Sequence, residues 1–331
     1  MTIPAKQKVV GIDVSKDSLA ICHLTGEKAQ HLETENNQAG FKQLVKQCGT
    51  DSLYVMEATG IYYLQLAYYL YEQGAQVVVV NPVIIKRYIQ MHLGKGKSDK
   101  KDAQWIRRYG EQNQTAYWQP EESIIVECRQ LEQVTEQLIK QKTMVINSLE
   151  ALELQPIKSQ LAAKSLKQTL KTLEKQIKQL EDKLLATLEK AFTKEIKLLS
   201  SIPGIGRKTA GMLLLFAGGF RQVSNYRQLI AKAGLSPREY TSGSSIRGKV
   251  RITKMGGSLI RSKLFMCSFS AKKSNAACKA LYERLVAKGK NGKLALIAVC
   301  NKLLKQAFAI VKSGIPYRPD FANIFTQKLD F

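Results

Sequence analysis

Four acidic residues near the start of the chain have the types and spacing of a metal site. They are Asp13, Glu57 and the pair Asp99 and Asp102. On a helix, side chains three residues apart point to the same side, so the last two carboxylates share one face. Carboxylates gathered at short range repel one another unless a cation neutralises them, and oxygen ligands without nearby His or Cys suit Mg²⁺ or Mn²⁺. Two such ions can stabilise both oxygens of a phosphoryl displacement.

The elements that would position these acids follow from the hydrophobic pattern of residues 1–118. The predicted strands cover residues 9–14, 18–24, 29–34, 53–56 and 76–80, and the predicted helices begin near Phe41, Ile61 and Ser98. We interpret Asn81-Pro82 as the stop of the last strand. The order of three strands, helix, strand, helix, strand, helix predicts an α/β RNase H-like (RuvC-like) domain. In such a sheet the first and fourth strands are adjacent and the last helix crosses near them, so the four acids converge.

Each acid also has an ordinary alternative when it is taken alone. Asp13 fits a turn, and Asp99 fits the first turn of a helix, where the helix dipole favours a carboxylate. The joint placement of the acids on the first strand, the fourth strand and the last helix favours a shared metal site over four independent roles.

A second candidate for chemistry is Ser242, which begins the run Ser242-Gly243-Ser244-Ser245. A serine becomes a nucleophile only when a base or a metal activates it, and the last histidine of the chain is His92. Activation would therefore come from the carboxylate-bound metals, brought from another domain or another subunit. The alternative is a polar loop whose hydroxyls only hydrogen-bond phosphate, and the residues by themselves favour that alternative.

Positive charge is concentrated in residues 199–331. They carry 24 Lys and Arg against 4 Asp and Glu, whereas the ratio is 14 to 11 in residues 1–120 and 13 to 12 in residues 121–198. Such a segment repels itself unless a polyanion neutralises it, which predicts nucleic-acid binding rather than a merely solvated basic face. The candidate phosphate contacts are Gly204, Gly206, Arg207 and Lys208 in a helix-hairpin-helix-like turn, and Arg247, Lys249, Arg251 and Lys254 beyond the serine. For the glycines, a plain turn between helices is the alternative.

The middle of the chain has the pattern of a helical hairpin. Its apolar residues alternate spacings of four and three, as in a coiled-coil seam: Leu166, Leu170, Leu173, Ile177, Leu180 and Leu184. With Pro156 in the turn, residues 122–195 predict a hairpin that pairs within itself or with another subunit. We therefore divide the chain into an α/β catalytic domain (1–118), a coiled-coil hairpin (119–197) and a basic, mainly α-helical domain (198–331).

Cysteine usage and hydropathy argue against other classes. The six cysteines form no CxxC pair and there are only three histidines, which argues against a zinc site or a disulfide framework and predicts a reducing cytoplasm. The chain begins without a charged-then-apolar leader and has no uninterrupted apolar stretch of about 18 residues. We expect a cytoplasmic protein associated with the nucleoid and not with a membrane.

Five motifs occur in an order that resembles a known family. They are Gly11-Ile12-Asp13, Glu57-Ala58-Thr59-Gly60, Lys97-Ser98-Asp99-Lys100-Lys101-Asp102-Ala103, Ala233-Gly234-Leu235-Ser236-Pro237-Arg238, and Ser242-Gly243-Ser244-Ser245 followed by Arg247-Gly248. Together they resemble the DEDD-type insertion-sequence transposases, a family that includes the Piv-type DNA invertases. The likeness spans essentially the whole chain, and no key position departs from it.

The resemblance implies a RuvC-like domain, a coiled-coil dimerisation arm and a C-terminal transposase domain. It implies that the DEDD acids are Asp13, Glu57, Asp99 and Asp102, and that Ser242 forms a covalent phosphoserine link with the help of Mg²⁺ or Mn²⁺. It further implies double-stranded donor and target DNA, a structured bridge RNA that pairs with both, and a homo-oligomer through the dimerisation arm. The sequence leaves open whether the active assembly is a dimer or a tetramer.

Three functions stay open at this point. The first is a recombinase that exchanges strands through phosphoserine, and the second is a metal-dependent DNA nuclease or junction resolvase that uses activated water. The third is a nucleic-acid-binding protein that has lost its chemistry. A transient protein–DNA link separates the first from the second, and four mutually repelling carboxylates count against the third.

Overall fold

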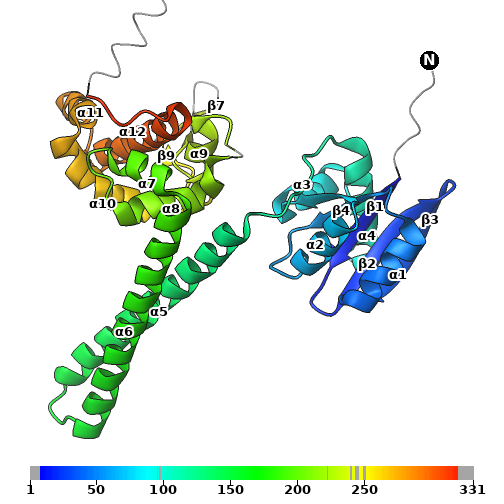
Figure 1. The fold of residues 1–331 in the computed structure, drawn as a ribbon, viewed down its shortest axis with the longest axis horizontal. Coiled ribbons are helices and arrows are strands. Elements are labelled where there is room, and N and C mark those ends of the chain that lie inside the picture. The colour runs from blue at the N-terminus through cyan, green and yellow to red at the C-terminus, as the bar shows by residue number, and fades with distance from the viewer. Residues whose placement is uncertain are drawn as a thin grey trace, which may run out of the picture. The chain divides into compact units, whose positions relative to one another are not determined.

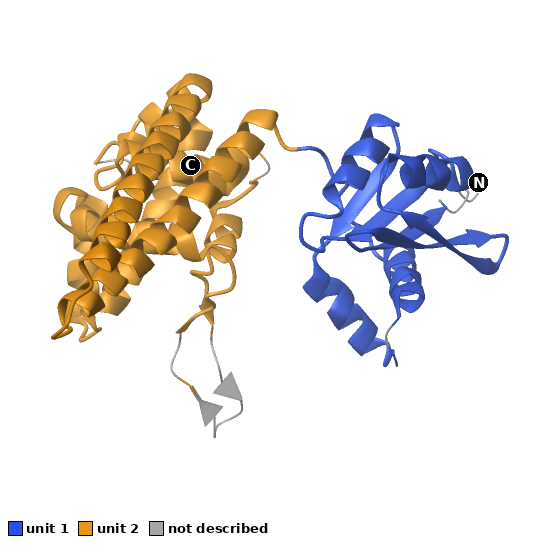
Figure 2. Ribbon diagram, turned by 90° about the horizontal axis from the view of Figure 1, so that it is seen from below, with its two compact units in different colours: residues 1–120 blue, residues 121–331 orange. Residues whose placement is uncertain are grey.

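The computed structural model describes residues 8–94, 96, 98–221, 223–238, 241–242, 246–248 and 251–319 of the 331-residue chain, with the backbone alone described at 241–242 and 246–247. The chain divides into two compact units, residues 1–120 and 121–331 (Figure 2). The first unit ends two residues beyond residue 118, which is the predicted end of the α/β domain.

Unit 1 is built on a five-stranded mixed sheet with the strand order β3-β2-β1-β4-β5. The strands are β1 (Val9–Val14), β2 (Ser18–Thr25), β3 (Lys28–Glu35), β4 (Leu53–Glu57) and β5 (Gln76–Val80). β1 pairs antiparallel with β2 and parallel with β4, and β4 pairs parallel with β5. The predicted adjacency of the first and fourth strands is therefore confirmed.

Four helices complete the described part of unit 1, two against each face of the sheet (Figure 1). They are α1 (Gln38–Cys48), α2 (Leu64–Glu72), α3 (Pro82–Met91) and α4 (Asp99–Gln112). Successive residues of a strand point to opposite faces. Accordingly, Val10 and Ile12 pack with the buried residues of α1 and α2, whereas Val9 packs with those of α3 and α4.

Helix α3 corrects the interpretation of Asn81-Pro82 as a strand stop alone. The Asn81 side chain accepts a hydrogen bond from the backbone N–H of Val83 at 2.9 Å, which satisfies one of the free donors at the start of a helix. Pro82 occupies the first helical turn, where a missing N–H costs nothing. The same dipeptide therefore ends β5 and begins α3.

Two glycines set the distance between α4 and the sheet. A Cβ on Gly11 would lie 2.3 Å from both the Ala103 carbonyl oxygen and the Arg107 backbone nitrogen, and a Cβ on Gly110 would lie 2.5 Å from Val55 Cγ2 and 3.0 Å from Val9 Cγ1. The helix backbone thus rests directly on β1. Because its later residues lie beside Val9 and its earlier ones beside Gly11, α4 runs antiparallel to β1.

The predicted hairpin is present in unit 2 as α5 (Ser123–Glu153) and α6 (Gln160–Ala191), which pack against each other on either side of the turn at Pro156 (Figure 1). The six seam residues of α6 are buried or half-buried, and Leu173 is the least exposed of them. An ion pair of 2.8 Å joins Lys142 of α5 to Glu174 of α6. The seam is therefore used within the chain, and self-association through it stays a prediction.

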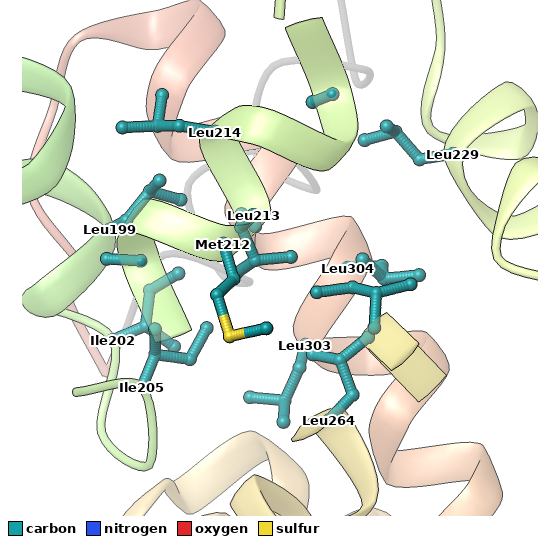
Figure 3. Packing of buried hydrophobic residues seen from close by; sticks show 14 of the residues in the cluster. Leu199, Ile202, Ile205, Met212, Leu213, Leu214, Leu229, Leu264, Leu303 and Leu304 are labelled. Atoms are coloured by element: carbon teal, nitrogen blue, oxygen red, sulfur yellow. The ribbon is translucent and has the colours of Figure 1, made fainter. Parts of the chain in front are cut away.

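Six further helices and two short strand pairs make up the rest of unit 2 as far as the structure describes it. They are α7 (Thr193–Ser200), α8 (Arg207–Ala217), α9 (Tyr226–Lys232), α10 (Ser258–Ser274), α11 (Ala276–Ala287), α12 (Gly292–Ser313), the pair β6 (Pro237–Arg238) with β9 (Arg251–Ile252), and the pair β7 (Thr241–Ser242) with β8 (Ile246–Arg247). A 3₁₀ turn, Gly218–Phe220, follows α8. Leucines and isoleucines from α7, α8, α10 and α12 meet in one core (Figure 3).

By length and composition alone, helix α12 is long and apolar enough to cross a membrane. We did not predict this feature from the sequence, because we considered only uninterrupted apolar stretches. Eight of its residues, however, are buried inside the protein: Ala295, Leu296, Val299, Cys300, Leu303, Leu304, Ala307 and Ile310. Most of these side chains belong to the core of unit 2, which accounts for the apolar composition of the helix.

We predict that Gly11→Ala lowers the free energy of unfolding of unit 1 by about 2–3 kcal/mol, because the added methyl group must push α4 away from β1. Thermal and urea denaturation followed by circular dichroism measure this effect. Gly26→Asn is the matched control, since Gly26 has a φ of +62° that Asn tolerates and no atom lies within 4 Å of the position that its Cβ would take. Equal stability of Gly11→Ala and the wild type would contradict the close packing.

Candidate active site

Asp13 and Glu57 lie side by side at the carboxyl ends of two neighbouring strands. In the parallel pairing of β1 and β4, Gly11 is opposite Val55 and Ile12 is opposite Met56, so the next position sets Asp13 opposite Glu57. Both acids alternate with residues that face α1 and α2, and they therefore face the α4 side. Each of the two residues is half-buried.

Asp99 and Asp102 extend the face of α4 that rests on the sheet. That face consists of the buried residues Ala103, Ile106, Arg107 and Gly110. Helical spacing continues the same stripe toward the N-terminus through Asp102 and Asp99. Since Ala103 lies against Gly11, the preceding turn of α4 lies toward Asp13, and the predicted convergence of the four positions is supported by the backbone.

Ser98 fixes where α4 begins. Its side chain accepts a hydrogen bond from the Lys101 backbone N–H at 3.3 Å, and its own backbone is extended. Asp99 and Asp102 are the acids of the first turn, where the positive end of the helix dipole favours carboxylates. The dipole offsets part of the cost of placing two acids near Asp13 and Glu57.

Glu57 is held by the loop that follows it. The Thr59 hydroxyl donates a hydrogen bond to Glu57 Oε1 at 3.2 Å, and the Thr59 backbone N–H donates to the Glu57 carbonyl at 2.8 Å. The Ala58 N–H donates to the Val80 carbonyl at 2.9 Å, which ties this loop to β5. The Glu57-Ala58-Thr59-Gly60 motif therefore orients its own carboxylate.

The donor set fits a hard divalent cation. Four carboxylate side chains at one edge of a sheet supply the oxygen ligands that Mg²⁺ and Mn²⁺ prefer. Among the residues that the structure describes, no three His, Cys, Asp or Glu side chains are already gathered as a metal-binding cluster. The backbone thus brings the four acidic positions toward one edge of the sheet, but their side chains, all among the described residues, are not gathered as a metal-binding cluster in this structure.

Ser242 lies on a β-ribbon of unit 2. In β7 and β8, Thr241 is opposite Arg247 and Ser242 is opposite Ile246; in β6 and β9, Pro237 is opposite Ile252. The two pairs follow each other along the same two chain segments, so the serine is carried on an antiparallel ribbon. The Ser242 and Arg247 side chains, and the whole of Gly243, Ser244, Ser245 and Lys249, lie outside the described residues.

The foot of this ribbon is packed without room for side chains. Gly234 has a φ of +65°, and a Cβ there would lie 2.6 Å from the Met255 carbonyl oxygen. Across the foot, the Lys254 N–H donates to the Gly234 carbonyl at 2.9 Å and the Thr253 N–H donates to the Ser236 carbonyl at 3.0 Å. The Ala233-Gly234-Leu235-Ser236 motif thus anchors the ribbon that carries the serine.

Arg261 of α10 clamps the two sides of the foot. Its Nη1 donates to the Ala233 carbonyl at 2.8 Å and to the Gly256 carbonyl at 2.6 Å. Asn301 of α12 donates through Nδ2 to the Leu235 carbonyl at 3.2 Å. The ribbon is therefore fixed to two helices of the core by side chains that satisfy its backbone carbonyls.

The predicted helix-hairpin-helix turn has two different glycines. Gly204, with a φ of +102°, lies so close to α10 that a Cβ would be 2.7 Å from Ala271 Cβ, whereas nothing lies within 4 Å of a Cβ on Gly206. Arg207 Nε is 3.1 Å from Glu189, and Lys208 pairs with Glu181, both on α6. The close packing against α10 thus explains the glycine at position 204. Arg207 and Lys208 are paired with acids of the hairpin. Arg251 and Lys254, the other described candidates for phosphate contact, are exposed.

Known proteins resemble both the segment that carries the acids and the segment that carries Ser242. A DEDD-type IS110 transposase family matches residues 10–156, which include all four acids, and the transposase family IS116/IS110/IS902 matches residues 196–283, which include Ser242. The pilin gene-inverting protein of Moraxella lacunata is 32% identical over 321 residues, covering 93% of this chain and 97% of that protein. This chain belongs to the IS110-type DEDD transposase family.

Other relatives span nearly the same length. The pilin gene-inverting protein of Moraxella bovis is 30% identical to this transposase-family chain, with 93% of the chain and 97% of that protein covered. The transposase for insertion sequence element IS1111A of Coxiella burnetii is 23% identical and covers 94% of the chain and 91% of that protein. These relatives therefore match the chain across the segments that carry the acids, the hairpin and the serine ribbon.

Arg261, Asn301 and Thr59 were not singled out from the sequence of this family member. Arg261 is one of 24 Lys and Arg residues between 199 and 331, and nothing in its spacing separates it from the others. Thr59 stands in a motif of the family, yet its hydrogen bond to Glu57 depends on the loop conformation. All three roles follow from contacts that form only in the folded chain.

We predict that Arg261→Ala loosens the foot of the ribbon, because two backbone carbonyls lose a charged donor; the cost is about 2 kcal/mol. Hydrogen exchange of the Thr253 and Lys254 amides should become faster, as read by mass spectrometry. The matched control is Arg227→Ala, an exposed arginine on α9. Unchanged exchange at residues 251–256 would show that the clamp does not hold the ribbon.

Proposed function

We propose that this protein is a DNA recombinase of the transposase type, which cuts and rejoins DNA strands through a phosphoserine at Ser242. The observation that carries the proposal is the parallel register that sets Asp13 opposite Glu57, with the first turn of α4 adding Asp99 and Asp102 at the same edge. The names of the relatives, pilin gene-inverting protein and transposase, support the same class of reaction.

We assign unit 1 to the RNase H-like (RuvC-like) architecture. The strand order β3-β2-β1-β4-β5, the antiparallel neighbour on one side of β1 and the helices on both faces support this assignment. Unit 2 contains the hairpin of the proposed middle domain (119–197) and the helical transposase domain (198–331).

The four acids would hold Mg²⁺ or Mn²⁺, and the bound metal would neutralise charge on a DNA phosphate. Thr59 orients Glu57 through its hydroxyl, and Gly11 keeps α4 close enough for its first turn to reach the strand ends. Ser242 has no histidine near it in sequence to take its proton, so its activation depends on the acid edge.

The covalent step balances as follows. Ser242 Oγ loses its proton and bonds to phosphorus, while the bond from phosphorus to one deoxyribose oxygen breaks and the leaving oxygen is protonated. In the joining step a strand hydroxyl attacks the phosphoserine, and the serine takes back a proton. The acids lie in unit 1 and the serine lies in unit 2. The complete site would therefore form in one of two ways: both units of one chain contribute, or one subunit of a dimer or tetramer supplies the acids and another supplies the serine.

Unit 2 supplies the nucleic-acid contacts of this proposal. We assign the phosphates of donor and target DNA, and of a bridge RNA that pairs with both, to the basic segment from residue 199 onward. Its charge ratio of 24 Lys and Arg to 4 Asp and Glu supports this assignment. Arg207 and Lys208 would exchange their partners on α6 for phosphate.

A metal-dependent nuclease or junction resolvase is the second candidate. It is favoured by one observation: the acid edge is complete within unit 1, whereas the serine belongs to unit 2. In that reaction the metals would activate water, and no protein would become attached to DNA.

We predict that Asp13→Ala, Glu57→Ala, Asp99→Ala and Asp102→Ala each abolish recombination in a plasmid inversion assay and weaken Mn²⁺ binding measured by calorimetry. Stability without metal should be unchanged or slightly higher, since like charges no longer repel. Asp17→Ala, an exposed acid just beyond β1, is the control and should behave as wild type. A variant with full activity and metal binding would remove that residue from the site.

We predict that Ser242→Ala still binds DNA but leaves no covalent protein–DNA adduct on denaturing gels. Ser244→Ala and Ser245→Ala are the matched controls and should keep the adduct. If the site forms between subunits, a mixture of Ser242→Ala with Asp99→Ala recovers activity. Cleavage without any adduct in the wild type would favour the nuclease, and an adduct that survives Ser242→Ala would assign the attack to another residue.

A further inference from the structure

A cationic groove lies between α11 and α12, and none of Arg207, Lys208, Arg251 and Lys254 lines it. It consists of two adjoining hollows of about 500 and 210 Å³, which share Ala277, Lys302 and Lys305. Small side chains line its walls, including Ala280 of α11 and Ala298 of α12. Leu281, Ile310 and Pro319 add apolar surface, and the charged ends of longer side chains lie at this largely apolar lining.

Four cations line this groove, and the described lining contains no acid. Arg284 comes from α11, Lys302 and Lys305 from α12, and Arg318 from the segment after α12. Within the described part of the chain none of these four has an ion pair, and Glu283 is the one acid described between residues 199 and 319; it lies 4.0 Å from Lys279. Like charges facing one hollow repel one another until a polyanion neutralises them.

Aromatic rings accompany the charges. Tyr317 lines the second hollow and is fixed there, since its hydroxyl donates to Asn275 Oδ1 at 3.1 Å. Lys305 Nζ lies 5.0 Å from the centre of the Tyr226 ring. Tyr226 itself does not line either hollow, so Tyr317 is the aromatic side chain that the described lining offers to a base. Positive grooves that follow the backbone and aromatic side chains that stack on bases are how many proteins hold single strands.

We expect a groove between two packed helices to favour a single strand over a duplex. α11 and α12 pack directly on each other, and packed helices lie only about 8–10 Å apart. A hollow between two such helices admits one sugar-phosphate chain, whereas a duplex would have to rest on its rim.

The groove is tied to the serine ribbon through α12. Asn301 lines the first hollow, and the same side chain donates to the Leu235 carbonyl at the foot of the ribbon. A strand seated in the groove is therefore held at a fixed distance from the foot of the ribbon that carries Ser242.

We propose that this groove binds the backbone of a single-stranded nucleic acid, at a second site separate from the DNA phosphate attacked at Ser242. The inference rests on the proposed function in one respect, that the polyanion is nucleic acid. RNA and unpaired DNA share the phosphate chemistry that the groove recognises, and the experiment separates them.

The test measures binding of fluorescein-labelled 20-nucleotide single-stranded RNA, single-stranded DNA and 20-base-pair duplex DNA to the full-length protein by anisotropy over a range of salt. The groove variant is Arg284→Gln with Lys302→Gln and Lys305→Gln. Its matched control is Lys288→Gln with Lys290→Gln and Lys293→Gln, three exposed lysines outside the groove, so both proteins lose the same charge.

We expect the groove variant to bind single strands roughly 10- to 100-fold more weakly at 0.1 M salt and to lose about 2 from the slope of log affinity against log salt, because three phosphate contacts are removed. The control should lose less than about 3-fold, and duplex binding should change little in either protein. The stronger of the RNA and DNA effects identifies the natural strand.

Equal losses in the groove variant and the control would overturn the proposal, since bulk charge would then explain the binding. Wild-type affinity in the groove variant would overturn it directly, and an equal loss of duplex binding would assign the groove to duplex DNA. Cross-linking of 4-thiouridine-labelled RNA to peptides of α11 and α12 gives a second readout if the variant folds poorly.

Ser242→Ala and Asp99→Ala separate this inference from the proposed function. Both should bind single strands as the wild type does, because neither residue lines the groove. Suppose that the wild type forms no adduct while the groove variant loses single-strand binding. That result would contradict the recombinase proposal and still support single-strand binding in the groove. Adduct formation with no loss in the groove variant would do the reverse.

Discussion

The direct contact of α4 with β1 is the constraint on which the acid edge depends. At position 11, glycine is the only residue type that leaves room for the Ala103 carbonyl and the Arg107 N–H to rest on the strand. This contact fixes both the depth of α4 and the direction in which its first turn points. The parallel register of β1 and β4 places the other two acids. Backbone packing thus brings four acidic positions toward one edge of the sheet, although among the described residues their side chains are not gathered as a metal-binding cluster.

The serine ribbon is positioned by a different means. Its foot is held by hydrogen bonds from the core: Arg261 to two carbonyls and Asn301 to a third. The left-handed conformation of Gly234 lets the two segments of the foot touch. Chemistry that needs both the acids and the serine therefore combines a rigid sheet edge with a ribbon on a separate helical unit.

The positive charge of the chain is concentrated in the helical segment that follows the hairpin. Unit 1 and the hairpin are nearly balanced, and acids of α6 already pair with Arg207 and Lys208. Arg221 and Lys263 likewise pair with acids of α5 or of the residue before it, whereas Arg284, Lys302, Lys305 and Arg318 have no ion pair in the described chain. Under the proposed function, nucleic acid would be the counter-charge that relieves the repulsion among these cations. In the groove between α11 and α12, three of these cations, Arg284, Lys302 and Lys305, line one hollow.

The sequence by itself determined the order of the five strands of unit 1, the hairpin turn at Pro156 and the basic segment, because periodicity and charge are local properties of the chain; it missed α3. Tertiary structure decided what depends on contacts between distant residues. The close approach of α4 to Gly11, the pairing of the α6 seam with α5, and the Arg261 clamp all join segments that no local pattern links. Asn81-Pro82 illustrates the same limit, since a stop signal for a strand is also a start signal for a helix. In the folded chain Ile85 and Ile89 of this helix pack against the sheet, a contact that no local pattern contains.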